Sequence, residues 1–581
     1  MTMMPTTDFV PAVLDATKWE NIEPLLNALL EREVNSREEL EKWILDRSEL
    51  EAAIGESGAN TYIDMTCDTG DDAKQAAYTA FITEVVPKVK PVGFELDKKM
   101  KALCEEHGLS GDRYEVLFRD TAADVELFRP ENVAIETELA QLDQQYDKIC
   151  GAMTVEWDGE EKTMPMMGKY MESSDRSVRE DAWRKMASRR LEDAEQISAI
   201  YDEMVQKRHT VAKNAGFDDY IGYAFKSKHR FDYTPEMCKA FHDAVEKHVM
   251  PFVAELDATR KELLGLEALR PWDLAVDPKN RAALEPFEDG PDLVGKTRGV
   301  FDKLSPELSG FFASMGDGSN TSGTANGAML DLDSRKGKAP GGYLYFRDRS
   351  KLPFIFMNAA GQHRDVETMV HEAGHAFHAM YCNDEPLVWY RSAPLEFAEV
   401  ASMSMELLTM PYWDAYYPSR EDADRARRKQ LEGSIGLLPW IATIDAFQHW
   451  VYANPGHGRD ERTAAWLDLE GRFGHQGHRV DWSGLEEERK FVWQRQGHLF
   501  GVPFYYIEYG IAQLGALGIW LIAQEQGEEA ALTAYRKAMS LGGSRPLPEL
   551  FAAAGLDFDF GDATVGRLVE RVRAELEKLP A

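Results

Sequence analysis

Two histidines and a glutamate stand close enough in one segment to bind a metal ion and activate a water molecule. The segment is Val370-His371-Glu372-Ala373-Gly374-His375. Apolar residues recur at helical spacing from 365 to 381, which predicts one helix with Asp365 as its N-cap. On that helix His371 and His375 lie one turn apart on the same face, and Glu372 lies about 100° around the axis from His371. This H-E-x-x-H spacing is typical of zinc peptidases, in which the glutamate takes a proton from the attacking water.

A catalytic zinc ion usually has three protein ligands and one open position, so a third ligand must come from elsewhere in the chain. The histidine nearest in sequence, His378, falls on the same helix face. It lies about 10 Å along the axis from His371, so one ion cannot readily bind both while the helix continues. We expect His378 to pack beside the site or to support it by a hydrogen bond.

The segment 394–406 predicts a second helix with proline at its start. Three of its glutamates are candidate ligands. Glu399 and Glu406 differ by about 20° around this helix, so both can face the two histidines, whereas Glu396 points about 60° away. One of the pair can bind the metal while the other accepts a hydrogen bond from a ligating histidine. The spacing alone does not choose between Glu399 and Glu406.

Two other H-E-x-x-H classes lack their signatures here. The metzincin pattern needs Gly at position 378 and His at position 381, but the chain has His378 and Tyr381. The M1 aminopeptidases carry a Gly-Ala-Met-Glu-Asn motif upstream, whereas Gly327-Ala328-Met329 continues here with Leu330-Asp331. A helical carboxypeptidase with H-E-x-x-H and a downstream glutamate is the better rival to an endopeptidase.

Three short β-like segments precede the metal-binding helix, at 328–333, 342–346 and 354–357. Turns rich in Gly, Pro and Ser separate them. A sheet edge beside a metal ion can bind an extended peptide by strand addition and hold its scissile carbonyl over the ion. We therefore expect a small sheet, at about 328–358, that contributes to substrate binding.

The site motifs are His371-Glu372-Ala373-Gly374-His375-Ala376-Phe377-His378 and Glu399-Val400-Ala401-Ser402, with Glu406 seven residues after Glu399. In these motifs the chain resembles the M3, or thimet oligopeptidase-like, zinc peptidases, and most closely their oligoendopeptidase F branch. The resemblance extends over residues 200–560, through 230–235, 341–343, 356–358, 445–450 and 498–509. It implies that Glu399 is the third ligand of one Zn²⁺ per chain and that Glu406 supports a ligating histidine. It also implies substrate contacts from Gly342, Tyr343 and Asn358.

The stretch from His498 to Tyr509 can supply the hydrogen-bond donors that an oxyanion needs. Imidazole N–H and phenol O–H groups serve when they are placed in advance. In the family, a histidine and downstream tyrosines from this region approach the substrate. The resemblance therefore implies that His498, Tyr506 and Tyr509 stabilise the oxyanion and that Tyr505 contacts the substrate. The chain departs from the thimet-type members at Val502, where they carry another tyrosine.

Helical signals dominate the first 300 residues and return after the sheet, which predicts a mainly α fold. We expect an N-terminal helical lobe at 1–200 and a catalytic region at 201–581. The resemblance implies a two-lobed ellipsoid with zinc at the floor of a deep channel that admits only short, unstructured peptides. The implied function is hydrolysis of internal peptide bonds, with Glu372 as general base. The alternatives are the helical carboxypeptidase and a catalytically inactive peptide-binding protein.

Composition narrows the partners and the compartment. The net charge of −34 over 581 residues disfavours nucleic acid and anionic membranes. The five cysteines are odd in number and include no C-x-x-C pair, which indicates reduced thiols. The first 13 residues lack the features of a secretory signal, and the apolar stretch 505–524 contains Glu508 and Gln513, which predicts a buried helix rather than a membrane span. We expect a cytoplasmic monomer or small homo-oligomer that acts on oligopeptides.

Overall fold

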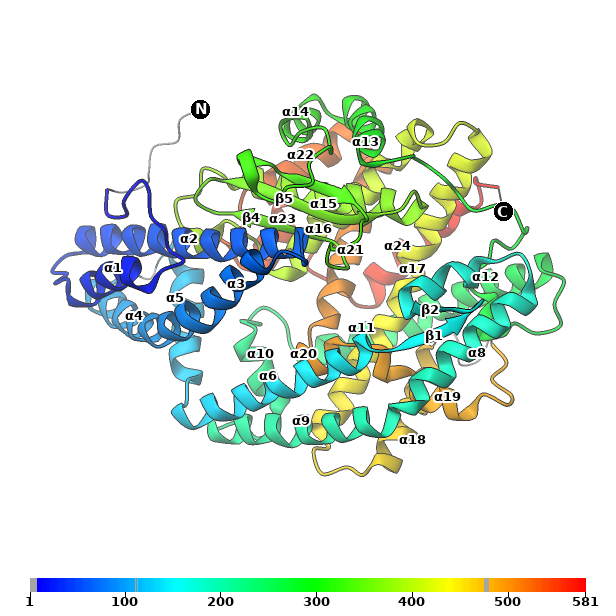
Figure 1. Ribbon diagram of the computed structural model, residues 1–581, viewed down its shortest axis with the longest axis horizontal. Coiled ribbons are helices and arrows are strands. Elements are labelled where there is room, and N and C mark those ends of the chain that lie inside the picture. Colours follow the sequence, from blue (N-terminus) through cyan, green and yellow to red (C-terminus); the bar gives the residue numbers. More distant parts are fainter. Residues whose placement is uncertain (1–7, 110, 112, 475–479, 581) are drawn as a thin grey trace.

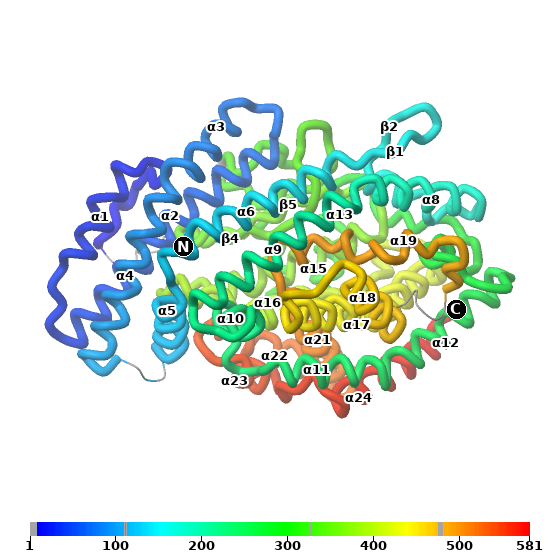
Figure 2. The backbone as a smooth tube through the Cα atoms, turned by 90° about the horizontal axis from the view of Figure 1, so that it is seen from below, coloured from blue at the N-terminus to red at the C-terminus, as the bar shows by residue number. Residues whose placement is uncertain are grey.

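The fold is mainly helical, as predicted. The computed structural model describes residues 8–109, 111, 113–474 and 480–580. Helices make up 69% of the structure, and within the described residues the named strands form two small sheets (Figure 1). Both views place the N-terminal helices at one end of an elongated molecule (Figures 1 and 2).

The N-terminal helices pack around a hydrophobic core of their own, which Leu387 and Tyr390 from a later loop complete. The main core begins at Leu142 and continues to Leu576, so it draws residues from both sides of position 200. The division into 1–200 and 201–581 stays a prediction. The helices of this end are α1 (Trp19–Glu31), α2 (Arg37–Cys67), α3 (Asp72–Ala80), α4 (Val86–His107) and α5 (Glu115–Leu127).

A second group of helices runs along the molecule and includes a hairpin that was not predicted. Its strands β1 (Thr154–Trp157) and β2 (Glu160–Thr163) pair antiparallel across Asp158-Gly159. Both turn residues have positive φ, 53° and 78°, which is the geometry that an Asp-Gly pair favours. The helices are α6 (Pro130–Gly151), α7 (Met164–Met167), α8 (Arg176–Glu192), α9 (Ala194–Asn214), α10 (Tyr220–Ser227), α11 (Pro235–Ala244) and α12 (Met250–Leu263).

The predicted small sheet lies directly before the metal-binding helix. The strands β3 (Leu330–Asp333), β4 (Tyr343–Arg347) and β5 (Leu352–Ala359) are ordered β3-β5-β4, with β3 parallel and β4 antiparallel to β5. This order leaves β4 at an edge of the sheet. The helices around it are α13 (Gly290–Leu304), α14 (Pro306–Ser314), α15 (His363–Tyr381) and α16 (Leu395–Thr409).

The helix α15 carries the H-E-x-x-H motif and starts two residues before the predicted N-cap. Asp365 still closes the helix start, because its Oδ2 accepts hydrogen bonds from the backbone N–H groups of Ala360 and Gln362 at 2.8 and 2.9 Å. The Asp365 carboxylate therefore caps the helix from its first turn, and the N-cap residue is Gln362.

The C-terminal helices surround α21, which lies at the centre of the main core. By length and composition α21 could cross a membrane, but 78% of its most apolar window is buried inside the fold, as the prediction of a buried helix requires. The helices are α17 (Arg420–Ala453), α18 (Arg459–Phe473), α19 (Glu486–Lys490), α20 (His498–Gly501), α21 (Tyr506–Gln526), α22 (Glu528–Met539), α23 (Leu547–Ala553) and α24 (Asp562–Leu576).

Candidate metal centre

Three predicted ligands meet where α15 crosses α16. The Nε2 atoms of His371 and His375 lie 3.4 and 3.6 Å from Oε2 of Glu399. The ligand atoms of all three side chains lie within 4.8 Å of one another, so one cation can contact them together. Ser402 donates a hydrogen bond to the same Glu399 oxygen at 3.1 Å and holds the carboxylate in place.

The approach of the two helices depends on Gly374, inside the H-E-x-x-H motif. A Cβ at this position would lie 2.6 Å from the carbonyl oxygen of Ala401 and 2.6 Å from Cα of Ser402. Any larger residue would push α16 away from α15. Tyr535 reinforces the crossing, because its hydroxyl lies 3.3 Å from the carbonyl oxygen of Gly374 and 3.2 Å from that of Ala401.

Glu406 contacts His371, as the proposed supporting role requires. Its Oε1 lies 2.6 Å from Nδ1 of His371, and its Oε2 accepts a hydrogen bond from Gln430 at 2.6 Å. Because Glu406 bonds Nδ1, Nε2 is the nitrogen of His371 that faces Glu399. Gln430 had no role in the sequence analysis, since a single glutamine on a long helix has no distinctive spacing.

The charges around His371 favour a cation. Burial alone would lower the pKa of His371, but its hydrogen bonds to Glu399 and Glu406 outweigh burial and raise the pKa well above its usual value. Burial alone would raise the pKa of Glu399, but His371 and His375 outweigh burial and lower this pKa to about 2. Burial lowers the pKa of His375 to about 4, so this imidazole is neutral and has a free lone pair. Two imidazoles and a carboxylate in such a field form a donor set that suits Zn²⁺.

Glu372 lies between this cluster and the edge of the sheet. Burial raises the pKa of Glu372 to about 7, His371 opposes the rise, and Glu399 and Glu406 add to it. A carboxyl group with a pKa near neutrality can both take and return a proton. The backbone N–H of Leu344, in β4, is among the groups that lower this pKa, so the strand edge adjoins the carboxylate.

His378 lies behind the site rather than in it. Its Nδ1 is 3.1 Å from the carbonyl oxygen of Met539, and its Nε2 accepts a hydrogen bond from the backbone N–H of Ala393 at 3.0 Å. Both nitrogens are therefore bound to backbone groups. Of the two roles expected for His378, packing agrees with these contacts.

The three residues expected from the sheet shape its edge. The amide nitrogen of Asn358 donates to two backbone carbonyls of the loop before β4, at 2.7 and 2.8 Å. The hydroxyl of Tyr343 lies 2.6 Å from that of Thr66 in α2. A Cβ on Gly342 would lie 3.4 Å from a backbone oxygen of β5. These residues fix the position of β4, which then presents its backbone beside Glu372.

The predicted oxyanion donors cluster around His498. The centroid of its ring lies 5.4, 5.1 and 5.9 Å from the ring centroids of Tyr505, Tyr506 and Tyr509. After burial, the charge of Glu399 is among the causes that raise the pKa values of Tyr505 and Tyr509. These two tyrosines therefore lie toward the metal ligands, whereas Tyr506 interacts with Trp440 and Gln496.

Gln496 determines which nitrogen of His498 carries the proton. The indole N–H of Trp440 can only donate, and it lies 3.0 Å from Oε1 of Gln496. The amide nitrogen of Gln496 therefore faces His498, and it lies 2.6 Å from Nδ1. Burial and the charge of Lys228 lower the pKa of His498, so the imidazole is neutral with its proton on Nε2. Sequence reasoning missed Gln496.

An unusual turn at Phe504 aims the tyrosines. Phe504 has a φ of +64°, a conformation that costs a bulky side chain about 1–3 kcal/mol. Its backbone N–H donates to Gln448 and its carbonyl accepts from Arg230, both at 2.5 Å. Arg230 also donates to Glu508, in the first turn of α21, at 2.6 Å. The segments 230–235 and 445–450, which carried part of the family resemblance, thus hold the tyrosine-bearing segment.

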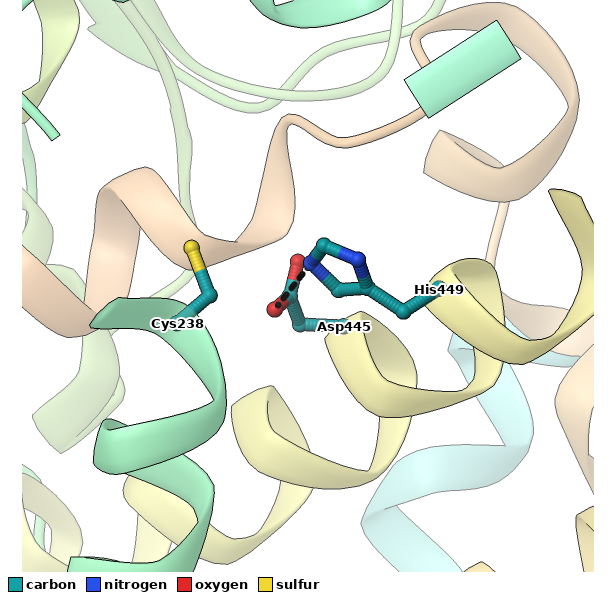
Figure 3. A group of neighbouring side chains, drawn as sticks. All are labelled: Cys238, Asp445 and His449. Carbon is teal, nitrogen blue, oxygen red and sulfur yellow. Dashed lines mark ion pairs between the residues drawn. The ribbon is translucent and has the colours of Figure 1, made fainter. Parts of the chain in front are cut away.

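A second group of potential metal ligands lies beneath this turn. Figure 3 shows Asp445 and His449 next to each other on α17, with Cys238 on α11. Oδ2 of Asp445 lies 2.8 Å from Nε2 of His242 and 3.4 Å from Nε2 of His449. Burial opposes the shift, but the two imidazoles lower the pKa of Asp445, while burial keeps the thiol of Cys238 protonated. We interpret this cluster as a buried ion network that joins α11 to α17.

A helical fold with H-E-x-x-H on one helix and a glutamate on the next defines the class of helical metallopeptidases. Within that class, the chain belongs to peptidase family M3, whose model matches residues 169–569, and the M3 N-terminal domain matches residues 9–128.

The similar proteins are oligopeptidases. The plasmid oligoendopeptidase F of Lactococcus lactis subsp. cremoris is 24% identical over 421 residues, which are 70% of this chain and 65% of that protein. The group B oligopeptidase PepB of Streptococcus agalactiae is 22% identical over 71% of this chain and 65% of its own length. The match thus spans slightly under two thirds of these relatives. The structure of PZ peptidase A with an inhibitor superposes with a TM-score of 0.87 at 28% identity, over 98% of this chain and 99% of that one.

Proposed function

We propose that the protein is a zinc-dependent endopeptidase that hydrolyses internal bonds of short, unstructured oligopeptides. The observation that carries this proposal is the convergence of His371, His375 and Glu399 beside Glu372, with the edge strand β4 adjoining the same carboxylate. The family membership and the similarity to oligoendopeptidase F support it.

Two imidazoles and the Glu399 carboxylate would hold one Zn²⁺, which supplies Lewis acidity toward a water molecule and the scissile carbonyl. An extended peptide would add to the edge of β4 by backbone hydrogen bonds. Glu372 would take the proton of the attacking water at its carboxylate and return it to the leaving amine. His498, through its Nε2–H, and Tyr509 or Tyr506 would donate hydrogen bonds to the developing oxyanion, with Tyr505 beside the substrate.

Two substitutions test the assigned roles. Glu372→Gln removes the proton acceptor and leaves the ligands intact, so we expect a loss of at least about 10³-fold in kcat with the metal retained. Glu399→Ala removes a ligand, so we expect a loss of the bound metal. Peptide hydrolysis and elemental analysis of the purified variants measure both effects. Wild-type turnover by Glu372→Gln would refute the mechanism.

The helical carboxypeptidase is the alternative function, and the position of the cleaved bond separates the two. Mass spectrometry of peptide digests should identify internal cleavage, and cleavage should persist when the C-terminus is amidated. Release of single C-terminal residues, abolished by amidation, would favour the carboxypeptidase. Absence of any hydrolysis by the zinc-loaded protein would favour a peptide-binding protein.

We further propose a cytoplasmic protein that is a monomer or small homo-oligomer, with an N-terminal lobe at 1–200 and a catalytic region at 201–581. The net charge of −34 supports a role away from nucleic acid and anionic membranes. Light scattering of the purified protein at two concentrations measures the oligomeric state.

A further inference from the structure

A cavity of about 410 Å³ lies between α12, α17, α18 and the segment before α20. Its volume is in the range of ligand pockets. Four cationic side chains and three acidic ones line it, although the whole chain has a net charge of −34. The cationic residues are Arg260, Arg428, Lys429 and Arg495, and the acidic residues are Asp257, Glu432 and Glu470.

Several of these charges already have partners. Glu432 lies 2.7 Å from Arg428, and Glu470 accepts a hydrogen bond from Arg489 at 2.6 Å. Arg260 donates to the carbonyl oxygen of Val276 at 2.6 Å. The acidic groups are thus largely neutralised by neighbours, and the balance of charge in the cavity depends on the remaining cations.

Two cations remain available to a ligand. Among the residues that the structure describes, neither Arg495 nor Lys429 has a hydrogen bond or an ion pair, and both side chains are exposed. The guanidinium of Arg495 lies 4.7 Å from the ring centroid of Trp440, which fixes its plane.

Arg495 adjoins the predicted oxyanion donors. Trp440, on which it stacks, donates to Gln496, and Gln496 contacts His498. Tyr506 lies at the same place, because its pKa depends on Trp440, Arg495 and Gln496 after burial. The side chains of Trp440 and Gln496 therefore link the cavity at Arg495 to the group around His498.

We propose that Arg495 binds a carboxylate group of the peptide substrate, with Lys429 as a second cation in the lining of the same cavity. The planar guanidinium matches a carboxylate in a bidentate pair, and the Lys429 ammonium adds a second positive charge. The carboxylate comes from the C-terminus of the peptide or from an Asp or Glu side chain. The cavity is then a specificity subsite of the reaction proposed above, on which this inference rests.

Two pairs of peptides test the proposal and distinguish the sources. One pair lacks acidic side chains and differs only in a free or amidated C-terminus. The other pair is amidated and differs only in Glu or Gln at one position C-terminal or N-terminal to the cleaved bond. We expect the wild-type protein to prefer the carboxylate of one pair by about 10- to 100-fold in kcat/KM. Equal rates within both pairs would overturn the proposal.

Variants assign the preference to the cavity. Arg495→Met keeps the apolar stem of the side chain. It should bring the ratio of kcat/KM for the carboxylate peptide to kcat/KM for its neutral analogue close to one, by slowing only the carboxylate peptide. Lys429→Met should reduce this ratio partly. Arg495→Lys keeps the charge and should retain part of it. The control is Arg420→Met, which should leave this ratio unchanged. Arg420 lies on α17, as Lys429 does, but it is 93% exposed, pairs with Asp424 and does not line the cavity. An unchanged ratio in Arg495→Met would refute the assignment.

A binding measurement separates this inference from the proposed function. Calorimetric titration of zinc-loaded Glu372→Gln protein with the carboxylate peptide and its neutral analogue reports recognition without turnover. Preference for the carboxylate without hydrolysis by the wild-type protein would support the subsite and refute the endopeptidase. Hydrolysis with equal affinity for both peptides would support the endopeptidase and refute the subsite.

Discussion

Glutamine side chains orient neighbouring groups at three places in the structure. Gln430 holds Glu406, Gln496 fixes the tautomer of His498, and Gln448 holds the turn at Phe504. An amide offers a donor and an acceptor at once, and it does not change charge with pH. An amide can therefore accept a hydrogen bond from an indole N–H, which can only donate, and donate one to an imidazole nitrogen, which then has to be the acceptor.

Replacement of Gln496 changes the proton position on His498. In Gln496→Glu, the carboxylate would accept a hydrogen bond from Nδ1–H, so the neutral imidazole loses the proton on Nε2. The new charge also raises the pKa of His498, and below that pKa the imidazolium donates from both nitrogens. We therefore expect kcat to fall by about 10²-fold at high pH and to recover as the pH is lowered. A pH profile of kcat measures this effect.

Gln496→Leu is the control for this prediction. It removes the hydrogen bond without adding a charge, so both tautomers become available. We expect a smaller loss and no new alkaline limb. If the Gln496→Glu profile is the same as that of the wild-type protein, Gln496 does not position His498.

At the scale of elements, the site depends on two contacts between helices. The crossing of α15 and α16 brings Glu399 to the histidines, and the packing of α11 against α17 places the ring of His449 5.1 Å from that of Phe504, just before α21. The H-E-x-x-H spacing and the helical period predicted the first contact in outline. The second could not be predicted from the sequence, because it depends on which buried polar groups meet across 200 residues of chain.

Gly374→Ala tests the first contact. The added methyl group would lie 2.6 Å from backbone atoms that cannot move independently, so α16 would shift away from α15. Overpacking of this kind costs about 1–3 kcal/mol, and we expect weaker metal binding as well. Gly295→Ala, in the exposed face of α13 with no atom within 4 Å, should instead be neutral or stabilising. Thermal unfolding and titration with a zinc chelator measure both.

Asp445→Asn tests the second contact. The imidazoles of His242 and His449 face Asp445, with the protonated thiol of Cys238 nearby, and they hold the pKa of Asp445 below its unfolded value. The ion network therefore stabilises the fold above the unfolded pKa, and its contribution is lost as the pH falls. We expect Asp445→Asn to lower the free energy of unfolding by about 3–5 kcal/mol at neutral pH. In denaturant titrations, the difference in the free energy of unfolding between the wild-type protein and Asp445→Asn should be smaller below about pH 4. A difference independent of pH would exclude an ionised Asp445.

At the scale of the whole molecule, the metal centre is a small part of a large core. The hydrophobic residues of the main core extend from Leu142 to Leu576, and the three ligands contribute little to it. We therefore expect chelation to abolish peptide hydrolysis and leave the helix content unchanged, with activity restored by Zn²⁺. Circular dichroism and a peptide assay on the same sample test this. Unfolding on chelation would make the metal structural.

Local patterns predicted the mainly helical fold and indicated the candidate ligands, and the remaining features depend on tertiary packing. Helical periodicity and turn residues gave the small sheet, α15, α16 and the buried α21, because each depends on neighbouring residues. The hairpin of β1 and β2 also has a local signal, the Asp158-Gly159 pair, although the sequence analysis did not predict this hairpin. The cavity around Arg495 had none, since its lining comes from five separate segments between Val253 and Arg495.

The turn at Phe504 has a consequence for protein synthesis. The candidate ligands lie within 29 residues of one another, from His371 to Glu399, but Tyr506 and Tyr509 follow a strained turn that Arg230, in the loop before α11, and Gln448, on α17, hold in place. Ribosomes add residues in order, so the donors emerge about a hundred residues after the ligands. They take their positions only when α11, α17 and α21 have packed together. With the proposed roles, an unfinished chain therefore lacks a complete site until its C-terminal helices have been synthesised.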